Sequence, residues 1–272
     1  MFTAIAIAAI AAIAAMVCGS VHIPTSEVLS ILTGHTPDKD TWGHIILDLR
    51  LPAVITAVLA GMSLAVAGLL MQTIFANPLA GPSIMGVSSG ASLGVAVLVL
   101  LFGAGTGAVV SGAILGAMAV VILLVALAGI LRSGVMLLIV GILISYLSSS
   151  AIILLNYAAS EQSVHTYVLW GMGTFSDTSW DQMAVPAAIT TIGMCAAVFM
   201  AKGLNAMLMG ENYAANLGVR VWALRAWALL TAGTLTAVTT AYCGPIAFIG
   251  LAVPHIARLA LGSTNPPRLL PL

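Results

Sequence analysis

Charged residues are scarce in this sequence. Only 6% of its 272 residues are Asp, Glu, Lys or Arg, eight of each sign, whereas soluble domains carry about 25%. The net charge of zero leaves no basic field for a nucleic acid, so nucleic-acid binding is excluded. A chain that is 61% hydrophobic, with a mean hydropathy of +1.16, is expected to be a polytopic membrane protein embedded in the lipid bilayer.

Cysteines and nucleotide-binding motifs are scarce as well. Cys18, Cys195 and Cys243 are odd in number and widely spaced, and they form no CxxC pair. This pattern argues against a disulfide scaffold and a structural metal, so no metal ligand is assigned. No segment matches the P-loop pattern G-x-x-x-x-G-K-[ST], so the chain is not expected to hydrolyse ATP by that route. We expect no cofactor bound by this chain.

The apolar runs predict the membrane spans. Residues 51–131 contain no charged side chain, and one helical span needs about 20 residues. Turn-forming residues at 77–82 and 103–107 divide this run into three helices. The predicted fold is all-α, one polytopic transmembrane helix bundle over residues 1–272. Its eight expected spans lie near 2–18, 53–75, 83–102, 108–131, 135–156, 183–201, 226–242 and 247–261.

Eight spans place both termini on one side, and positive charge selects that side. If the N-terminus is cytoplasmic, only Lys39 and Arg50 among the basic residues fall outside, and only Glu211 among the acidic residues falls inside. Residues 19–50 and 157–182 are expected to form short helices at the outer surface, because they contain tryptophans. The basic residues expected inside are Arg132, Lys202, Arg220, Arg225, Arg258 and Arg268.

One motif suggests an enzyme. Residues 86–90, Gly-Val-Ser-Ser-Gly, match the G-x-S-x-G nucleophile elbow, but that elbow needs a strand-to-helix turn and here it opens an apolar helix. An intramembrane serine hydrolase that pairs Ser88 with a histidine such as His255 is one alternative. An ion-coupled secondary transporter is another, although such carriers place charged residues within their spans. The glycines at 86, 90 and 94, and at 112 and 116, predict close helix packing.

Residues 202–225 form the most polar stretch that is expected inside. Gly210 and Gly218 are predicted to break it into two short helices. A surface that exposes Leu208, Met209, Ala214, Leu217 and Val219 is typical of a protein-docking site. An amphipathic connector lying in the lipid headgroups is the alternative.

Four motifs in one order resemble the FecCD-type permeases, the membrane subunits of ABC importers for iron–siderophores, haem and cobalamin. Residues 210–219, Gly-Glu-x-x-Ala-x-x-Leu-Gly-Val, are similar to the family's cytoplasmic coupling segment. Arg50-Leu51-Pro52 followed by Gln72 resembles its second span, although Ala53 stands where the family has a second arginine. The turn into the third span and the run of the eighth span are matched by Asn77, Pro78, Pro82, Gly86, Ser88 and Gly90, and by residues 244–258 with Pro254 and His255.

The resemblance implies a transport subunit and not an enzyme. It implies a homodimer or a paired permease, with two ABC ATPase subunits that bind ATP-Mg and a periplasmic or lipoprotein substrate-binding protein. The location implied is a bacterial cytoplasmic (inner) membrane. Family members usually have ten spans, so residues 1–272 would lack the last two, at a truncated C-terminus.

The resemblance also implies roles for particular residues. The binding protein would dock at Arg50, and the ATPases would dock on the coupling segment 202–225. The residues implied for ATPase coupling are Gly210, Glu211, Ala214, Leu217, Gly218 and Val219. Those implied for the translocation pathway or for helix packing are Gln72, Asn77, Pro78, Pro82, Gly86, Ser88, Gly90, Pro254 and His255.

Overall fold

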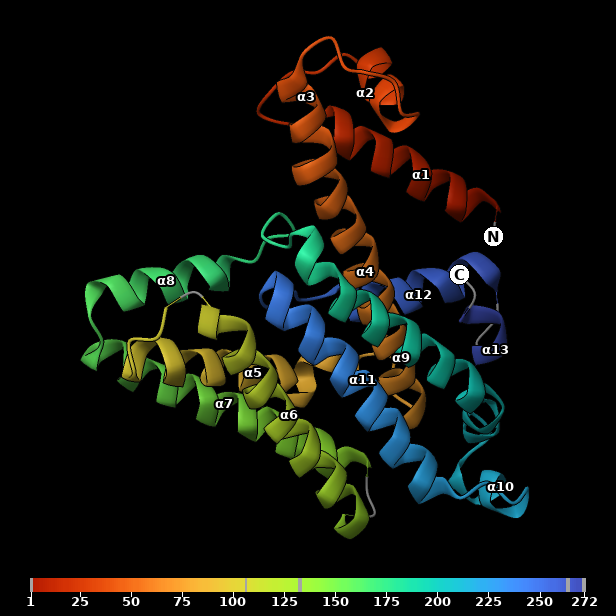
Figure 1. Cartoon of the computed structure of the whole chain (residues 1–272). Coiled ribbons are helices and arrows are strands. Elements are labelled where there is room, and N and C mark those ends of the chain that lie inside the picture. The colour runs from red at the N-terminus through yellow and green to blue at the C-terminus, as the bar shows by residue number, and fades with distance from the viewer. Residues whose placement is uncertain (1, 106, 132–133, 263–264, 271–272) are drawn as a thin grey trace.

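The computed structural model describes the chain except residues 1, 106, 132–133, 263–264 and 271–272. Every regular element in the described residues is a helix, as Figure 1 shows. Five helices are long and apolar enough to cross a membrane, and three apolar helices are shorter. The long ones lie at Asp40–Ile74, Gly107–Ile130, Gly134–Ala158, Trp180–Met207 and Val221–Cys243, and the shorter ones at Ile5–Val17, Val87–Leu101 and Ile249–Leu261.

These eight helices match the eight predicted spans, so the predicted all-α bundle is confirmed. Along the chain the elements are α1 (Phe2–Val17), α2 (Thr25–Leu32), α3 (Asp40–His44), the π-helical turn η1 (Ile45–Arg50), α4 (Leu51–Ile74), the 3₁₀ turn η2 (Pro82–Met85), α5 (Val87–Ala96), the π-helical turn η3 (Val97–Leu101), α6 (Gly107–Ile130), α7 (Gly134–Ala158), α8 (Glu161–Met172), α9 (Trp180–Met207), α10 (Glu211–Asn216), α11 (Val221–Cys243), α12 (Ile249–Leu261) and α13 (Pro266–Leu269).

The second span is longer than the sequence predicted. α3 and η1 continue directly into α4, so residues 40–74 form one helical run of 35 residues. At 1.5 Å per residue that run is about 50 Å long and exceeds the ~30 Å hydrocarbon core. The expectation that residues 40–50 belong to a separate surface helix was therefore wrong. The charges at Asp40, Asp48 and Arg50 end the apolar run but do not end the helix.

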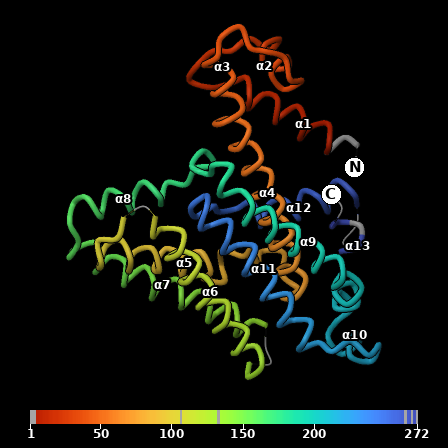
Figure 2. The backbone as a smooth tube through the Cα atoms, in the orientation of Figure 1, coloured from red at the N-terminus to blue at the C-terminus, as the bar shows by residue number. Residues whose placement is uncertain are grey.

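α11 lies at the centre of the bundle. It packs against α4, α5, α6 and α9, and the smooth trace in Figure 2 shows it crossing among these helices. Most of its buried residues are alanines and threonines, and the others are one glycine, two leucines, a valine, a cysteine and an arginine. Because lipid offers no hydrophobic driving force between helices, such small side chains allow the close approach that holds the bundle together.

The two predicted glycine ladders pack against each other. A Cβ on Gly94 would lie 2.1 Å from the carbonyl oxygen of Gly112, and a Cβ on Gly116 would lie 2.1 Å from that of Gly90. Only glycine permits these approaches between α5 and α6. The ladders therefore account for the packing of this pair, as the spacing predicted.

The connecting segments gather at two opposite ends of the bundle. At one end, which we call the α10 end, Phe75 packs on Gly134 and Trp222 packs on Gly129. At the other, the α3 end, the Trp180 indole N–H donates to the carbonyl of Leu47 at 2.9 Å. The backbone N–H of Thr174 donates to the backbone carbonyl of Cys243 there, at 3.0 Å. Consecutive spans are expected to begin at opposite ends of the bundle, and this grouping of the connecting segments agrees with that expectation.

Candidate functional site

The predicted coupling segment contains one short helix and not two. α9 continues to Met207, α10 occupies Glu211–Asn216, and α11 begins at Val221. Both glycines that were expected to interrupt the helices do so in left-handed conformations, Gly210 with φ +106° and Gly218 with φ +82°. The second helix was predicted because polar residues were taken to end the spans, whereas α9 and α11 extend past them.

The coupling segment exposes apolar side chains at the α10 end. Met209 is 71% exposed and Leu217 is 60% exposed. Ala214 is fully buried and Val219 is only partly exposed, so the expectation that Ala214 belongs to the exposed surface was wrong. A methyl group on this face of a short helix fits between the spans, and it anchors α10 to the bundle.

Arg225 was missed as a functional residue. The sequence placed it at a span boundary, but it lies one turn inside α11 and is 4% exposed. Its guanidinium donates to the carboxylate of Glu211, the acidic residue that was expected inside. The signal available in the sequence was the pairing of that solitary acid with a nearby arginine. Reasoning that treats charges as span ends cannot detect a charge within a span.

A second close contact joins α4 to the start of α12. A Cβ on Gly68 would lie 1.7 Å from the carbonyl oxygen of Gly250, and a Cβ on Gly250 would lie 2.8 Å from the ring of Pro82. α12 therefore begins deep along α4, and residues 244–248 reach this depth without helical structure. Thirteen residues of α12 cover about 20 Å, so the helix is shorter than the predicted span over 247–261.

Polar side chains surround this contact. The amide N–H of Gln72 donates to the carbonyl of Leu251 at 3.1 Å, and the Arg258 guanidinium donates to the Gln72 side-chain oxygen. Gln72 is 4% exposed. Leu251 is the third residue of α12, so this glutamine ties the first turn of that helix to α4.

Asn77, Pro78, Gly86 and Ser88, which were predicted for the pathway, do not lie at the contact that the Gln72 side chain makes with α12. Asn77 accepts the N–H of residue 79 at 2.9 Å and stabilises the turn after α4, where Pro78 is exposed. Gly86 packs on α7. The Ser88 hydroxyl lies 3.3 Å from that of Thr240, a partner that is no general base.

The predicted residues of α12 also separate. Pro254 is buried, whereas His255 is exposed. Gln72 and Pro82 therefore meet α12 near its start, and the His255 side chain is exposed further along that helix.

Arg50 lies between α1 and α4. Its guanidinium donates to the carbonyls of Met16, Val17 and Val21, at 3.2 Å for Val17 and 2.6 Å for Val21. A Cβ on Gly19 would lie 2.4 Å from this guanidinium, so glycine leaves room for it. Arg50 thereby caps the free carbonyls at the end of α1.

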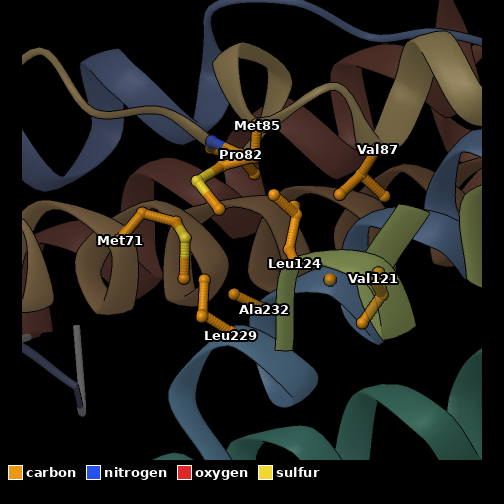
Figure 3. A pocket seen from close by; sticks show the side chains of 9 residues that line it. Met71, Pro82, Met85, Val87, Val121, Leu124, Leu229 and Ala232 are labelled. Atoms are coloured by element: carbon orange, nitrogen blue, oxygen red, sulfur yellow. The ribbon is translucent and has the colours of Figure 1, made fainter. Parts of the chain in front are cut away.

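The cavity beneath η2 is small and apolar. Figure 3 shows the sulfur-bearing side chains of Met71 and Met85 pointing into it, together with Leu124 and Leu229. Its volume of about 10 Å³ is at the lower limit for one water molecule. A metal chelate therefore has no room there. Within the described residues no group of three metal-ligating side chains occurs.

Two wider clefts open at the α3 end. One, of about 460 Å³, lies between α6, α8, α9 and α11 and includes Asp177 and Gln182. The other, of about 560 Å³, separates α1 from α4 and includes Arg50 and Phe175. These two clefts at the α3 end are far wider than the cavity beneath η2.

Known proteins are similar to this chain in sequence. The profile of the FecCD transport family matches residues 7–272. The hemin transport system permease protein of Yersinia pestis is 33% identical, over 85% of this chain and 71% of its own length. The ferric enterobactin transport system permease protein of Escherichia coli (strain K12) is also 33% identical, over 91% of this chain and 74% of its own length.

A solved structure supports the same relationship. An ABC transporter of the metal-chelate type, in an inward-facing conformation, superimposes with a TM-score of 0.87 and 27% sequence identity. The match covers 99% of this chain and 83% of that one. A match of fold and sequence over nearly the whole chain leads to one conclusion: the chain belongs to the FecCD transport family, as a multi-pass membrane permease.

Proposed function

We propose that this chain is the permease subunit of an ATP-driven importer that carries an iron–siderophore or a related metal chelate, such as haem or cobalamin, into the cytoplasm. Two permease chains pair around the pathway, two ATPase subunits bind ATP-Mg, and a periplasmic or lipoprotein binding protein delivers the cargo. The membrane is the cytoplasmic membrane, and the N-terminus lies inside.

The observation that carries this proposal is α10 with its flanking residues. This short helix projects at one end of the bundle between two left-handed glycines, and it exposes Met209 and Leu217. Exposed apolar side chains in an otherwise polar segment favour a protein partner. A bundle without a P-loop obtains energy from outside itself, and α10 is where an ATPase subunit would push.

The cargo is proposed from relatives that transport hemin and ferric enterobactin. The clefts at the α3 end lack a dedicated cluster of metal ligands in the described residues. A large chelate is therefore selected chiefly by the separate binding protein, and the permease provides passage. An iron–siderophore is our first choice.

Co-purification and uptake test the proposal. The permease, co-expressed with its ATPase and binding protein, should retain the ATPase in detergent and support ATP-dependent uptake in proteoliposomes. Radiolabelled ferric enterobactin, hemin and cobalamin are offered in turn. Failure of the ATPase to bind the wild-type chain would refute the role of α10 as a docking site.

Cysteine labelling tests the orientation. In a cysteine-free background, an impermeant maleimide should label Lys39→Cys in intact cells and Asn212→Cys only after the membrane is opened. Both positions are exposed. The reverse pattern would contradict a cytoplasmic N-terminus.

A further inference from the structure

An ion pair fastens α10 to the first turn of α11. The Arg225 guanidinium donates to the Glu211 carboxylate. The arginine is 4% exposed and the glutamate is 51% exposed, so one partner belongs to the bundle and the other to the protruding helix. A buried charge in a membrane bundle is costly unless it is paired. The position of α10 is therefore tied to that of α11.

A glycine with open space around it flanks α10 at each end. Gly210 and Gly218 adopt positive φ angles, yet a Cβ on either would meet no atom within 4 Å. The glycines are thus needed for the shape of the backbone and not for space. α10 itself has six residues, and Ala214 and Glu211 attach it to the bundle. Such a short body between two glycine turns can shift as a unit.

α11 has little freedom to move independently of the bundle. A Cβ on Gly233 would lie 2.4 Å from Val121 of α6, and a Cβ on Gly193 of α9 would lie 2.6 Å from Leu235 of α11. Packed interiors of this kind transmit a displacement, and the cavity beside the contact of Gly233 with Val121 has a volume of only about 10 Å³. A displacement of the start of α11 is therefore passed to α6 and α9.

We propose that Arg225 is the positioning residue of the coupling segment. Through Glu211 it holds α10 against α11, so that a displacement of α10 moves α11 with it. This inference rests on the proposed function, because an ATPase subunit would supply the displacement. Arg225 is too deeply buried to touch that subunit itself, so its effect on transport passes through the ion pair.

The test measures cargo taken up per ATP hydrolysed, in proteoliposomes of the complete transporter. Glu211→Gln and Arg225→Met should each lower this ratio about tenfold, within the range typical of coupling between sites. The ATPase should still co-purify with Arg225→Met, because the Arg225 side chain is only 4% exposed. Because both changes break one link, the double variant should be no worse than either single variant. Arg225→Lys keeps the positive charge, so it should retain part of the uptake per ATP that Arg225→Met loses.

A matched control separates the ion pair from the acidic charge at the start of α10. Glu211→Gln combined with Asn212→Asp keeps an acidic residue in the first turn but moves it away from Arg225, so uptake per ATP should stay low. Recovery in this control would overturn the proposal, as would an unchanged ratio in Glu211→Gln with normal assembly. If Arg225→Met fails to assemble, Glu211→Gln and Arg225→Lys decide. Absence of any ATP-dependent uptake in the wild type would instead refute the proposed function and the inference with it.

Discussion

The two ends of α4 hold their neighbours in different ways. At the α10 end, α4 touches α12 through backbone, with Gly68 against Gly250, and Gln72 bonds both to Leu251 and to Arg258. At the α3 end, Arg50 donates to the carbonyls of Met16 and Val17 in α1, beside an open cleft of about 560 Å³.

The difference indicates which of two contacts tolerates a structural change. We call the contact of α4 with α12, and the contact of α4 with α1, the two joints of α4. A contact between two backbones leaves no room for an added side chain, and it fixes the relative depth of the two helices. A bond from a long side chain to carbonyls accommodates small shifts of α1, since the arginine can follow them. We therefore expect the joint with α12 to be rigid and the joint with α1 to be adaptable.

The largest effect is expected at the backbone contact. Gly68→Leu should destabilise the protein by about 3 kcal/mol or more, because α12 must move away from α4. Gly61→Leu is the matched control in the same helix, since a Cβ there meets no atom within 4 Å. Thermal unfolding in detergent, followed by near-ultraviolet circular dichroism, measures both. Equal stability of the two variants would show that the contact is not rigid.

The polar part of the same joint should matter less. Gln72→Leu leaves the Leu251 carbonyl and Arg258 without this partner, which should cost about 1–3 kcal/mol. Thr73→Val is the control, because Thr73 is buried but bonds only to the carbonyl of Leu69 in its own helix. The midpoint of thermal unfolding should fall further for Gln72→Leu. If the midpoint falls further for Thr73→Val, Gln72 does not stabilise the contact between α4 and α12.

The joint with α1 should respond more weakly. Arg50→Met should cost about 1 kcal/mol and should speed hydrogen exchange in α1 without unfolding the rest. Gly19→Val should act similarly, because its side chain displaces the guanidinium. Ser20→Val, at the exposed neighbouring position, is the control. Exchange that rises equally in α1 and in α11 would mean that the two ends of α4 are not independent.

The smallest effect concerns the binding protein. If Arg50 also attracts an acidic partner, Arg50→Glu should slow capture of the binding protein less than about tenfold, and the difference should vanish at high salt. Lys39→Glu, at the exposed basic residue of the same end, should slow capture at least as much, because the Arg50 guanidinium is engaged by α1. Stopped-flow association at low salt compares them. If Arg50→Glu slows capture more than Lys39→Glu does, Arg50 also belongs to the surface that docks the binding protein.

The sequence by itself determined the number and order of the spans, the glycine packing of α5 on α6, and the family resemblance. These features depend on the length of apolar runs and on the spacing of small residues, which are local properties of the chain. The position of α10 was predicted for the same reason, since two glycines interrupt the helices there.

Only the tertiary structure decided which polar groups meet. The sequence treated Arg225 as the edge of a span, and it indicated no partner within the chain for Arg50. Gln72 and Arg258 lie 186 residues apart, and nothing local to either one indicates the other. In a membrane bundle the partner of a buried polar group is set by the close approach of helix backbones. Packing of the whole chain creates that approach, and no single segment contains it.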